Sequence, residues 1–260
     1  MTTNKSSKIA LTIAGSDPSG GAGFQADLKT FKSLGVYGVC VPTVLTAQNT
    51  EVVHDVQELT AAFFSKQIDV LLQDIRPDAV KTGMIYTLDF IRIIADKIRG
   101  KSLSNLVIDP VAVSSTGVLL MEEGLLDAVR QHLFPLSKVI TPNIYEASVL
   151  TGIDIKGKKE VKEAALKLKG YGPDAVIITG GHLEDKAVDL LFDEDEFLSL
   201  ENERLEGEFH GTGCVFSSVI TASLASGYNV KEAFIKANDF TYNAMVNAMS
   251  VGRGMKILNI

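Results

Sequence analysis

The chain has 260 residues, of which 46% are hydrophobic, so it can bury the core of one large domain or two small ones. Its 25 basic residues are outnumbered by 32 acidic ones, and no Lys/Arg cluster offers a footprint for a phosphate backbone, which argues against a nucleic-acid partner. No apolar run reaches membrane length, and two cysteines, Cys40 and Cys214, cannot form a disulfide framework. We therefore expect a globular, cytoplasmic protein with no membrane partner.

Short aliphatic runs alternate along the chain with longer amphipathic patterns. Strands are predicted at Ile9–Ala14, Val39–Leu45, Ala79–Lys81, Leu106–Asp109, Val139–Ile140 and Ala175–Thr179. Helices are predicted at Gln25–Leu34, Ala61–Gln73, Leu88–Ile98, Glu122–His132, Glu160–Leu168, Cys214–Ser226 and Val230–Ala248. This order, with nearly continuous apolar strands, predicts an α/β fold in which a doubly wound, mostly parallel central sheet has helices on both faces.

The segment between Lys186 and Phe209 departs from this alternation. Two short apolar runs flank an acidic turn there, which predicts a β-hairpin with a solvated tip. We find no repeat and no Pro- or Ser-rich linker that would divide the chain. The prediction is therefore a single domain over residues 1–260.

The first predicted strand leads into a glycine-rich loop, Gly15–Gly23, that precedes a helix. Asp17 and Pro18 lengthen this loop beyond the tight Gly-x-Gly-x-x-Gly spacing of dinucleotide folds, which disfavours nicotinamide binding. Ligands usually bind at the carboxyl ends of parallel strands, and Asp27, one turn into the helix, would face the same crevice. The alternative is a surface turn with a solvated Asp27.

Two further segments carry groups suited to a flat heterocycle. Gln48 follows an apolar run ending at Ala47, and its amide can pair with both a ring nitrogen and an exocyclic amino group. Met84 follows Gly83 after the next strand and can form an apolar wall against a ring. Each residue also has an ordinary interpretation, namely a polar turn for Gln48 and a core position for Met84.

Oxygen-rich segments close the later strands. Asp109, Asn143 and Glu146 follow two of them, and carboxylates beside a triphosphate commonly hold Mg²⁺, often through water. Asn143 equally fits a helix N-cap with Glu146 at the third helical position, and the two roles can coexist. Thr179 and Gly181 end the next strand and offer a hydroxyl and backbone groups to a nucleotide.

The most informative string is His210-Gly211-Thr212-Gly213-Cys214, which stands directly before an apolar helix. The first N–H groups of a helix lack intrahelical partners, and glycines allow a phosphate to approach them closely, so the string predicts an anion site for a transferring phosphoryl group. At this position the pKa of Cys214 is expected to fall, which would make its thiolate a candidate base. The alternative is a helix start packed with small residues and an inert cysteine. No Walker string is present, so the P-loop kinases are set aside.

Taken in order, these strings resemble the hydroxymethylpyrimidine/phosphomethylpyrimidine kinases of the ribokinase superfamily over essentially the whole chain. Ala10–Asp17 with Gly20–Phe31 resembles the first strand and helix of that family, and Thr46–Thr50 resembles its pyrimidine-recognition turn. The resemblance implies an enzyme that uses ATP and Mg²⁺ to phosphorylate the hydroxymethyl group of 4-amino-5-hydroxymethyl-2-methylpyrimidine in thiamine biosynthesis. It leaves open whether the monophosphate is also a substrate, and it favours a homodimer.

The resemblance also implies roles for individual residues. Those around the pyrimidine are Gly15, Ala22, Asp27, Gln48, Met84 and Val111, with Gln48 reading the aminopyrimidine edge. Asn143 and Glu146 serve the magnesium and phosphates. Gly211, Thr212 and Gly213 form the anion hole, and Cys214 stands where sugar kinases of the superfamily place an aspartate base.

One departure from the family pattern keeps an alternative open. Thr179 stands where many thiamine-pathway kinases have a Lys, so either Lys81 or another cation compensates at the γ-phosphate or the rate is modest. Thr in this place also occurs in related pyridoxine kinases, and a pyridoxine or pyridoxal kinase of vitamin B6 salvage is the nearest alternative, although Gln48 favours the aminopyrimidine. A non-catalytic nucleotide-binding regulator is the alternative from a different class, and the anion-hole string with Cys214 argues against it.

Overall fold

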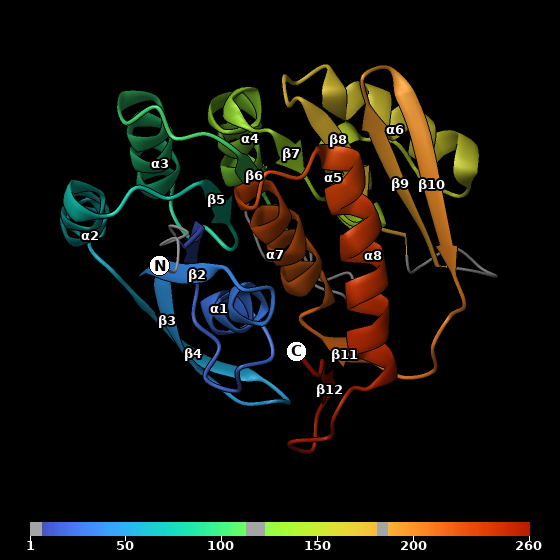
Figure 1. Cartoon of the computed structure of the whole chain (residues 1–260), viewed down its shortest axis with the longest axis horizontal. Coiled ribbons are helices and arrows are strands. Elements are labelled where there is room, and N and C mark those ends of the chain that lie inside the picture. Colours follow the sequence, from blue (N-terminus) through green and yellow to red (C-terminus); the bar gives the residue numbers. More distant parts are fainter. Residues whose placement is uncertain (1–6, 113–122, 181–186) are drawn as a thin grey trace, which may run out of the picture.

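An eight-stranded sheet in the order β10-β9-β8-β7-β6-β5-β1-β2 crosses the molecule (Figure 1). The computed structural model describes residues 7–112, 123–180 and 187–260. The strands are β1 (Ile9–Ala14), β2 (Tyr37–Pro42), β5 (Ala79–Thr82), β6 (Leu106–Ile108), β7 (Val139–Ile140), β8 (Ala175–Ile178), β9 (Ala187–Asp193) and β10 (Glu196–Asn202). Neighbours from β2 to β8 are parallel, whereas β9 and β10 form the predicted antiparallel hairpin at one edge. The predicted doubly wound, mostly parallel fold is confirmed.

Helices cover both faces of this sheet. One face carries α1 (Gly23–Ser33), α7 (Thr212–Ala225) and α8 (Val230–Val246). The other carries α2 (Ala61–Asp74), α3 (Leu88–Gly100), α4 (Glu123–His132), the 3-10 turn η1 (Phe134–Leu136), α5 (Ile144–Thr151) and α6 (Lys158–Lys169). Within β1, Leu11 and Ile13 pack towards the α2–α6 face while Ala10 packs towards α1 and α7, which explains why both strand faces are apolar in sequence.

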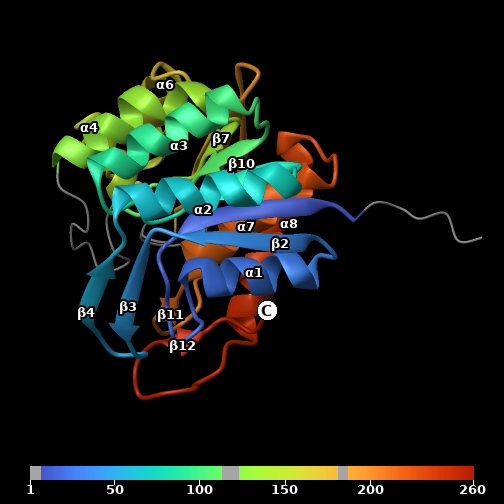
Figure 2. The same cartoon turned by 90° about the vertical axis from the view of Figure 1, so that its left-hand side faces the viewer.

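The prediction of one strand over Val39–Leu45 was wrong. β2 ends at Pro42, and Val44 starts β3 (Val44–Gln48), which pairs with β4 (Val53–Glu58) in a separate antiparallel hairpin that stands off the main sheet (Figure 2). Pro42 has no N–H with which to extend a ladder. Thr43 then turns the chain, because its N–H donates to the Ala14 carbonyl at 3.0 Å and its hydroxyl to the Met84 carbonyl at 2.8 Å.

Short elements complete the fold at the C-terminal end. β11 (Phe209–His210) pairs in parallel with β12 (Lys256–Ile257), and at two residues each they were too short to predict. Helix α7 begins at Thr212, slightly before the predicted Cys214, because Gly211 occupies its N-cap in the left-handed region at φ 85°. No helix among the described residues is long and apolar enough to cross a membrane.

Candidate active site at the carboxyl ends of the strands

The predicted site residues meet at one edge of the sheet. Gly15 follows β1, Met84 follows β5, Asp109 follows β6, Asn143 follows β7 and Thr179 follows β8. Since these strands are parallel, their carboxyl ends share an edge, which is where α/β folds bind ligands. Gly181 lies outside the described residues.

The glycine-rich loop and the start of α7 are in close contact. A Cβ on Gly211 would lie 1.9 Å from the Gly21 carbonyl oxygen, and one on Gly21 would lie 2.6 Å from Cδ2 of His210. Nε2 of His210 lies 2.8 Å from Oδ2 of Asp17, which also accepts the Ala22 N–H. Burial raises the pKa of Asp17, but hydrogen bonds from His210 and its own loop outweigh this and lower it to about 2.

The start of α7 presents backbone donors. Val215 is the first residue whose N–H is bonded within the helix, to the Gly211 carbonyl at 2.9 Å. The N–H groups of Thr212, Gly213 and Cys214 precede it and have no partner among the described residues. Gly213 is exposed, and a Cβ there would have no atom within 4 Å. An anion can therefore reach amides that also carry the positive end of the helix dipole.

The expectation of a lowered thiol pKa at Cys214 was wrong. Burial raises the pKa of Cys214 to about 12, and the carboxylates of Asp109 and Asp27 add to the effect, although the Lys81 ammonium opposes it. The helix start alone predicted the opposite direction, because the sequence could not show two carboxylates gathering beneath the sulfur. The residue as a whole is half-buried at the start of the helix, while burial of the thiol itself is the largest cause of its raised pKa.

Beneath the anion site lies a buried ionic cluster. The ammonium of Lys81, which has no exposed surface, lies 3.0 Å from Asp27 Oδ1 and 3.7 Å from Asp109 Oδ2. Burial lowers the pKa of Lys81, but the charges of Asp27, Cys214 and Asp109 raise it well above its ordinary value. Lys81 therefore does not reach a γ-phosphate at the surface. It does not replace the Lys that many thiamine-pathway kinases have at the position of Thr179.

Asp27 belongs to this cluster and has no exposed surface. Its carboxylate accepts hydrogen bonds from Thr12 Oγ1 at 2.5 Å and Ser218 Oγ at 2.7 Å, besides the Lys81 ammonium. The structure therefore places Asp27 below the floor of the site, so the interpretation that it faces the crevice was wrong. Its neighbours gave little signal, since Ser218 looked like an ordinary small residue and only Lys81, charged within an apolar strand, stood out.

Two of the predicted ring-binding residues, Gly15 and Met84, are in contact. A Cβ on Gly15 would lie 2.7 Å from Cε of Met84 and 3.0 Å from Cγ1 of Val44, so both side chains pack over a bare backbone. Ala22 is partly exposed beside them on the glycine loop. Val111 adopts φ 46°, which is strained for a β-branched residue and is typical of positions held for function.

Gln48 lies on the inward face of the β3–β4 hairpin. Along β3, Val44, Thr46 and Gln48 are at least partly buried while Leu45 and Ala47 are exposed, as the two-residue period of a strand requires. Thr46 fastens the hairpin to the glycine loop, because its N–H donates to Ser16 Oγ at 2.8 Å. Its hydroxyl donates to the Ser16 carbonyl at 2.9 Å and also lies 3.3 Å from Oε1 of Gln48.

The predicted capping box at Asn143 and Glu146 is present. Glu146 Oε2 accepts the Asn143 N–H at 2.9 Å, and Asn143 Oδ1 accepts the Glu146 N–H at 2.9 Å. Glu146 Oε1 also accepts the Ala112 N–H at 2.8 Å, so this carboxylate joins the ends of β6 and β7. Thr179 pairs with Asn143 in a parallel bridge and is partly exposed at the same edge.

The donor set is compatible with Mg²⁺ held partly through water. Among the described residues no three His, Cys, Asp or Glu side chains converge on one point, as an all-protein metal cage would require. Two buried carboxyl groups, those of Asp109 and Asp27, face the single ammonium of Lys81, so one of them has no matching cation. Burial raises the pKa of Asp109, although the charge of Lys81 and the hydrogen bond from Ser217 act in the opposite direction. A cation at this edge of the sheet would offset the cost of burying the ionised carboxylate.

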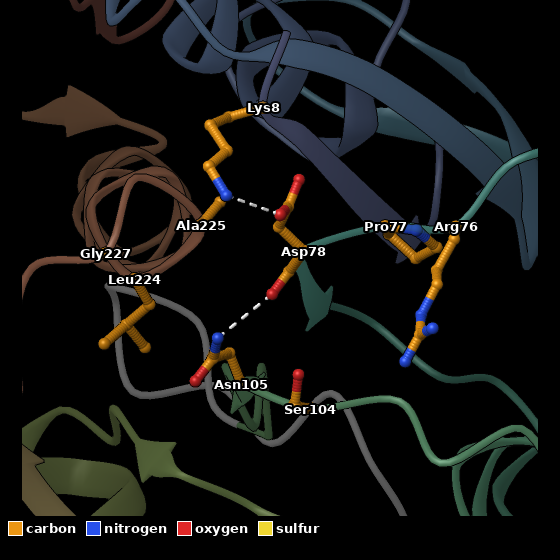
Figure 3. A pocket seen from close by; sticks show the side chains of 9 residues that line it. All are labelled: Lys8, Arg76, Pro77, Asp78, Ser104, Asn105, Leu224, Ala225 and Gly227. Atoms are coloured by element: carbon orange, nitrogen blue, oxygen red, sulfur yellow. Dashed lines mark hydrogen bonds and ion pairs between the residues drawn. The ribbon is translucent and has the colours of Figure 1, made fainter. Parts of the chain in front are cut away.

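A pocket of about 400 Å³ lies at the opposite end of the sheet (Figure 3). Lys8, Asp78 and Asn105, which line it, directly precede β1, β5 and β6, so it opens at the amino ends of the strands. Asp78 pairs there with Lys8 at 2.7 Å and receives the Asn105 amide on its carbonyl at 3.0 Å. None of the predicted site residues lines this pocket.

A doubly wound sheet with an open, glycine-lined start of α7 is the arrangement of a ribokinase-like phosphotransferase. The chain belongs to the phosphomethylpyrimidine kinase family, whose sequence pattern matches residues 17–259. The resemblance stated from the motifs is thereby confirmed, as are the enzyme class and the use of ATP that a kinase of this family implies.

Individual relatives carry two related names. The chain is 42% identical over 248 residues to a hydroxymethylpyrimidine/phosphomethylpyrimidine kinase of Bacillus subtilis, covering 94% of this chain and 92% of that protein. It is 44% identical over 237 residues to a pyridoxine kinase of the same organism, covering 89% and 88% of the two chains. Among solved structures, an ADP complex of Bacillus subtilis pyridoxal kinase matches with a TM-score of 0.89 and 40% identity, covering 98% of this chain and 97% of that one.

Proposed function

We propose that this protein transfers the γ-phosphoryl group of ATP to the hydroxymethyl group of 4-amino-5-hydroxymethyl-2-methylpyrimidine, a step of thiamine biosynthesis. The observation that carries the proposal is the open start of α7, where the amides of Thr212, Gly213 and Cys214 have no partner among the described residues. The start of α7 lies against the glycine loop that follows Gly15, because a Cβ on Gly211 would lie 1.9 Å from the Gly21 carbonyl oxygen, and the acceptor and the phosphoryl group would meet beside this contact.

The transfer itself depends mainly on position and charge. The acceptor oxygen forms a bond to the γ-phosphorus while the bond from that phosphorus to the bridging oxygen breaks, and ADP leaves. The amides of Thr212, Gly213 and Cys214 stabilise the charge on the transferring group. Cys214 in its thiolate form accepts the proton of the hydroxymethyl group, and the raised pKa of this thiol keeps the thiolate scarce at neutral pH.

The ring is held by a polar edge and apolar walls. Gln48 pairs with the ring nitrogen and the exocyclic amino group, since its amide both donates and accepts hydrogen bonds. Met84 and Gly15 form one wall, and Ala22 and Val111 close the remaining sides. Asp27 supports this floor from below, through Lys81 and Ser218, and does not touch the ring.

Nucleotide and metal lie along the ends of β6, β7 and β8. Asp109 and Glu146 would hold Mg²⁺, and the ion would supply positive charge against the phosphate oxygens. Asn143 and Thr179, with Gly181, contact the phosphates and nucleotide. The capping box leaves the Asn143 amide nitrogen pointing away from its helix bond, because Oδ1 is the atom that accepts from Glu146.

A substrate panel tests the proposal. ADP release is measured with ATP and Mg²⁺ against hydroxymethylpyrimidine, its monophosphate, pyridoxine and pyridoxal. We expect the highest kcat/KM with hydroxymethylpyrimidine, and the monophosphate result decides whether the second phosphorylation occurs. ADP release with none of the four rings would overturn the proposal.

Gln48→Leu tests ring recognition directly. The variant leaves the polar edge of the pyrimidine unpaired in a closed site, so kcat/KM for the pyrimidine should fall about 100-fold. The KM for ATP should stay unchanged, since Gln48 lies on the hairpin and not at the strand ends that take the nucleotide. Ala47→Ser, on the exposed face of the same strand, is the control. Equal efficiency of Gln48→Leu and wild type would remove Gln48 from recognition.

A second candidate activity is phosphorylation of pyridoxine or pyridoxal. Two observations favour it: the 44% identical relative is named a pyridoxine kinase, and Thr179 stands where many thiamine-pathway kinases have Lys. A pyridine ring lacks the amino group that Gln48 would read. The same panel separates the two, because a pyridoxine kinase would use pyridoxal at least as efficiently as the pyrimidine.

We also propose a cytoplasmic homodimer. Both cysteines are free thiols, as a reducing compartment keeps them. Large apolar side chains are exposed on the hairpin and on α2, including Leu45, Val53, Phe63 and Val70, which a second copy would cover. Sedimentation of the purified protein should give twice the mass of the chain, and a monomer at micromolar concentration would contradict the dimer.

A further inference from the structure

The C-terminal segment reaches the tip of the β3–β4 hairpin. Met249 and Ile257 exchange backbone hydrogen bonds at 2.8 and 2.9 Å, which closes residues 250–256 into a loop. The tip of this loop lies against the turn that follows Gln48, and both cartoons show the two segments side by side (Figures 1 and 2). We call Ser250–Met255 the clamp loop.

Two glycines make this contact. The Gly254 N–H donates to Thr50 Oγ1 at 3.2 Å. A Cβ on Gly254 would lie 1.8 Å from the Thr50 carbonyl oxygen, and one on Gly252 would lie 2.2 Å from Thr50 Oγ1. Neither glycine has a positive φ, so the reason for glycine here is close approach and not backbone conformation.

The turn that Gly252 and Gly254 contact is fixed by its own hydrogen bonds. Asn49 Oδ1 accepts the N–H groups of Glu51 and Val52 at 2.8 and 2.9 Å, and the Asn49 N–H donates to the Val52 carbonyl at 3.2 Å. Because these hydrogen bonds fix the turn, a displacement of Thr50 also displaces Gln48, two residues away.

The base of the clamp loop is tied to the anion site. β12 pairs with β11, which ends at His210 directly before Gly211. Ile257 also packs over the glycine loop, since a Cβ on Gly21 would lie 3.1 Å from Cγ1 of Ile257. One continuous segment thus touches the ring-recognition turn at its tip and the phosphoryl-binding loops at its base.

We propose that Gly252 and Gly254 are positioning residues: through Thr50 they hold Gln48 at a fixed place relative to the anion site, and so set the affinity for the ring substrate. This inference rests on the proposed function of Gln48 in ring recognition. It assigns to the C-terminal loop a part in setting the affinity for the ring substrate.

Kinetics of two alanine variants test the clamp. Gly254→Ala forces the Thr50 carbonyl away, and Gly252→Ala forces its side chain away, so each should raise the KM for the ring about 10-fold while the KM for ATP stays within about twofold. Gly100→Ala is the matched control, because a Cβ on that exposed glycine meets nothing within 4 Å. An unchanged ring KM in both variants overturns the proposal.

A rescue experiment separates the two clashes. Thr50→Ala removes Oγ1 and Cγ2, which a Cβ on Gly252 would approach to 2.2 and 2.9 Å, and leaves Cβ at 3.1 Å. The Gly252→Ala/Thr50→Ala double variant should therefore recover most of the ring affinity of Thr50→Ala alone. Gly254→Ala should not be rescued, since it meets the backbone. Rescue of neither variant or of both would contradict the assigned contacts.

Hydrogen exchange gives a readout that needs no activity. Amides of residues 44–58 should exchange faster in Gly254→Ala than in wild type, while those of α3 are unchanged. If the wild type phosphorylates no ring, the proposed function fails, and exchange still tests the clamp. Faster exchange with an unchanged ring KM in an active enzyme would show that the loop holds the hairpin without positioning Gln48, which also overturns the proposal.

Discussion

At the scale of single residues, Cys214 shows how surroundings override a local rule. A helix start lowers a thiol pKa, yet burial with Asp109 and Asp27 nearby raises the pKa of Cys214 to about 12. The sulfur is therefore protonated at neutral pH, and its thiolate fraction grows about tenfold for each unit that the pH rises below that value.

The role of Cys214 as base gives a prediction with a defined sign. Turnover of the wild type should increase from pH 7 to pH 9, because more thiolate is available, whereas Cys214→Ala should have a flat profile and a kcat lower by about 100-fold. The KM for ATP should change little. Cys40→Ser is the control, since the second thiol lies on β2 outside the proposed site. Identical pH profiles in wild type and Cys214→Ala would show that another group takes the proton.

At the scale of elements, the start of α7 combines a required glycine with an optional one. Gly211 has φ 85° and lies against the Gly21 carbonyl, so no other residue fits there without strain. Gly213 has ordinary helical geometry and free space around it. Gly211 is therefore required by the backbone, whereas the role that we propose for Gly213 is to keep the amides open to an anion.

Alanine substitutions at Gly211 and Gly213 should separate the structural role of the first glycine from the binding role proposed for the second. Gly213→Ala should keep the free energy of unfolding within about 1 kcal/mol of wild type, since Ala favours a helix, and should lower kcat/KM for ATP about 100-fold by covering the donors. Gly211→Ala should lower the free energy of unfolding by about 2 kcal/mol or more. Urea unfolding and steady-state kinetics measure the two effects. A fully active Gly213→Ala would mean that the phosphoryl group binds elsewhere.

At the scale of the whole molecule, one buried cluster joins segments far apart in sequence. Thr12 of β1, Asp27 of α1, Lys81 of β5 and Ser218 of α7 share hydrogen bonds without exposure to solvent. Opposite charges at 3.0 Å compensate each other only while both are present. The cluster therefore ties the sheet to helix α7, as expected for the single domain predicted over residues 1–260.

Removing only one charge of the Lys81–Asp27 ion pair should lower the free energy of unfolding more than removing both charges does. Lys81→Met leaves the carboxylate of Asp27 buried without its cation, so the free energy of unfolding should fall by about 3–5 kcal/mol. Adding Asp27→Asn should recover part of that loss, which a double-mutant cycle by urea unfolding measures. Strict additivity of the two single substitutions would mean that the charges do not interact.

The sequence alone determined the sheet with helices on both faces, the capping box at Asn143, and the strand-end residues that gather at one edge. It could do so because hydrophobic period, cap residues and glycine runs act over a few neighbouring positions. Tertiary structure decided the break at Pro42, the burial of Asp27 with Lys81, the pKa of Cys214 and the contact of Gly254 with Thr50. Each of these depends on desolvation or close approach between residues distant in the chain, and such effects exist only once the segments have packed together.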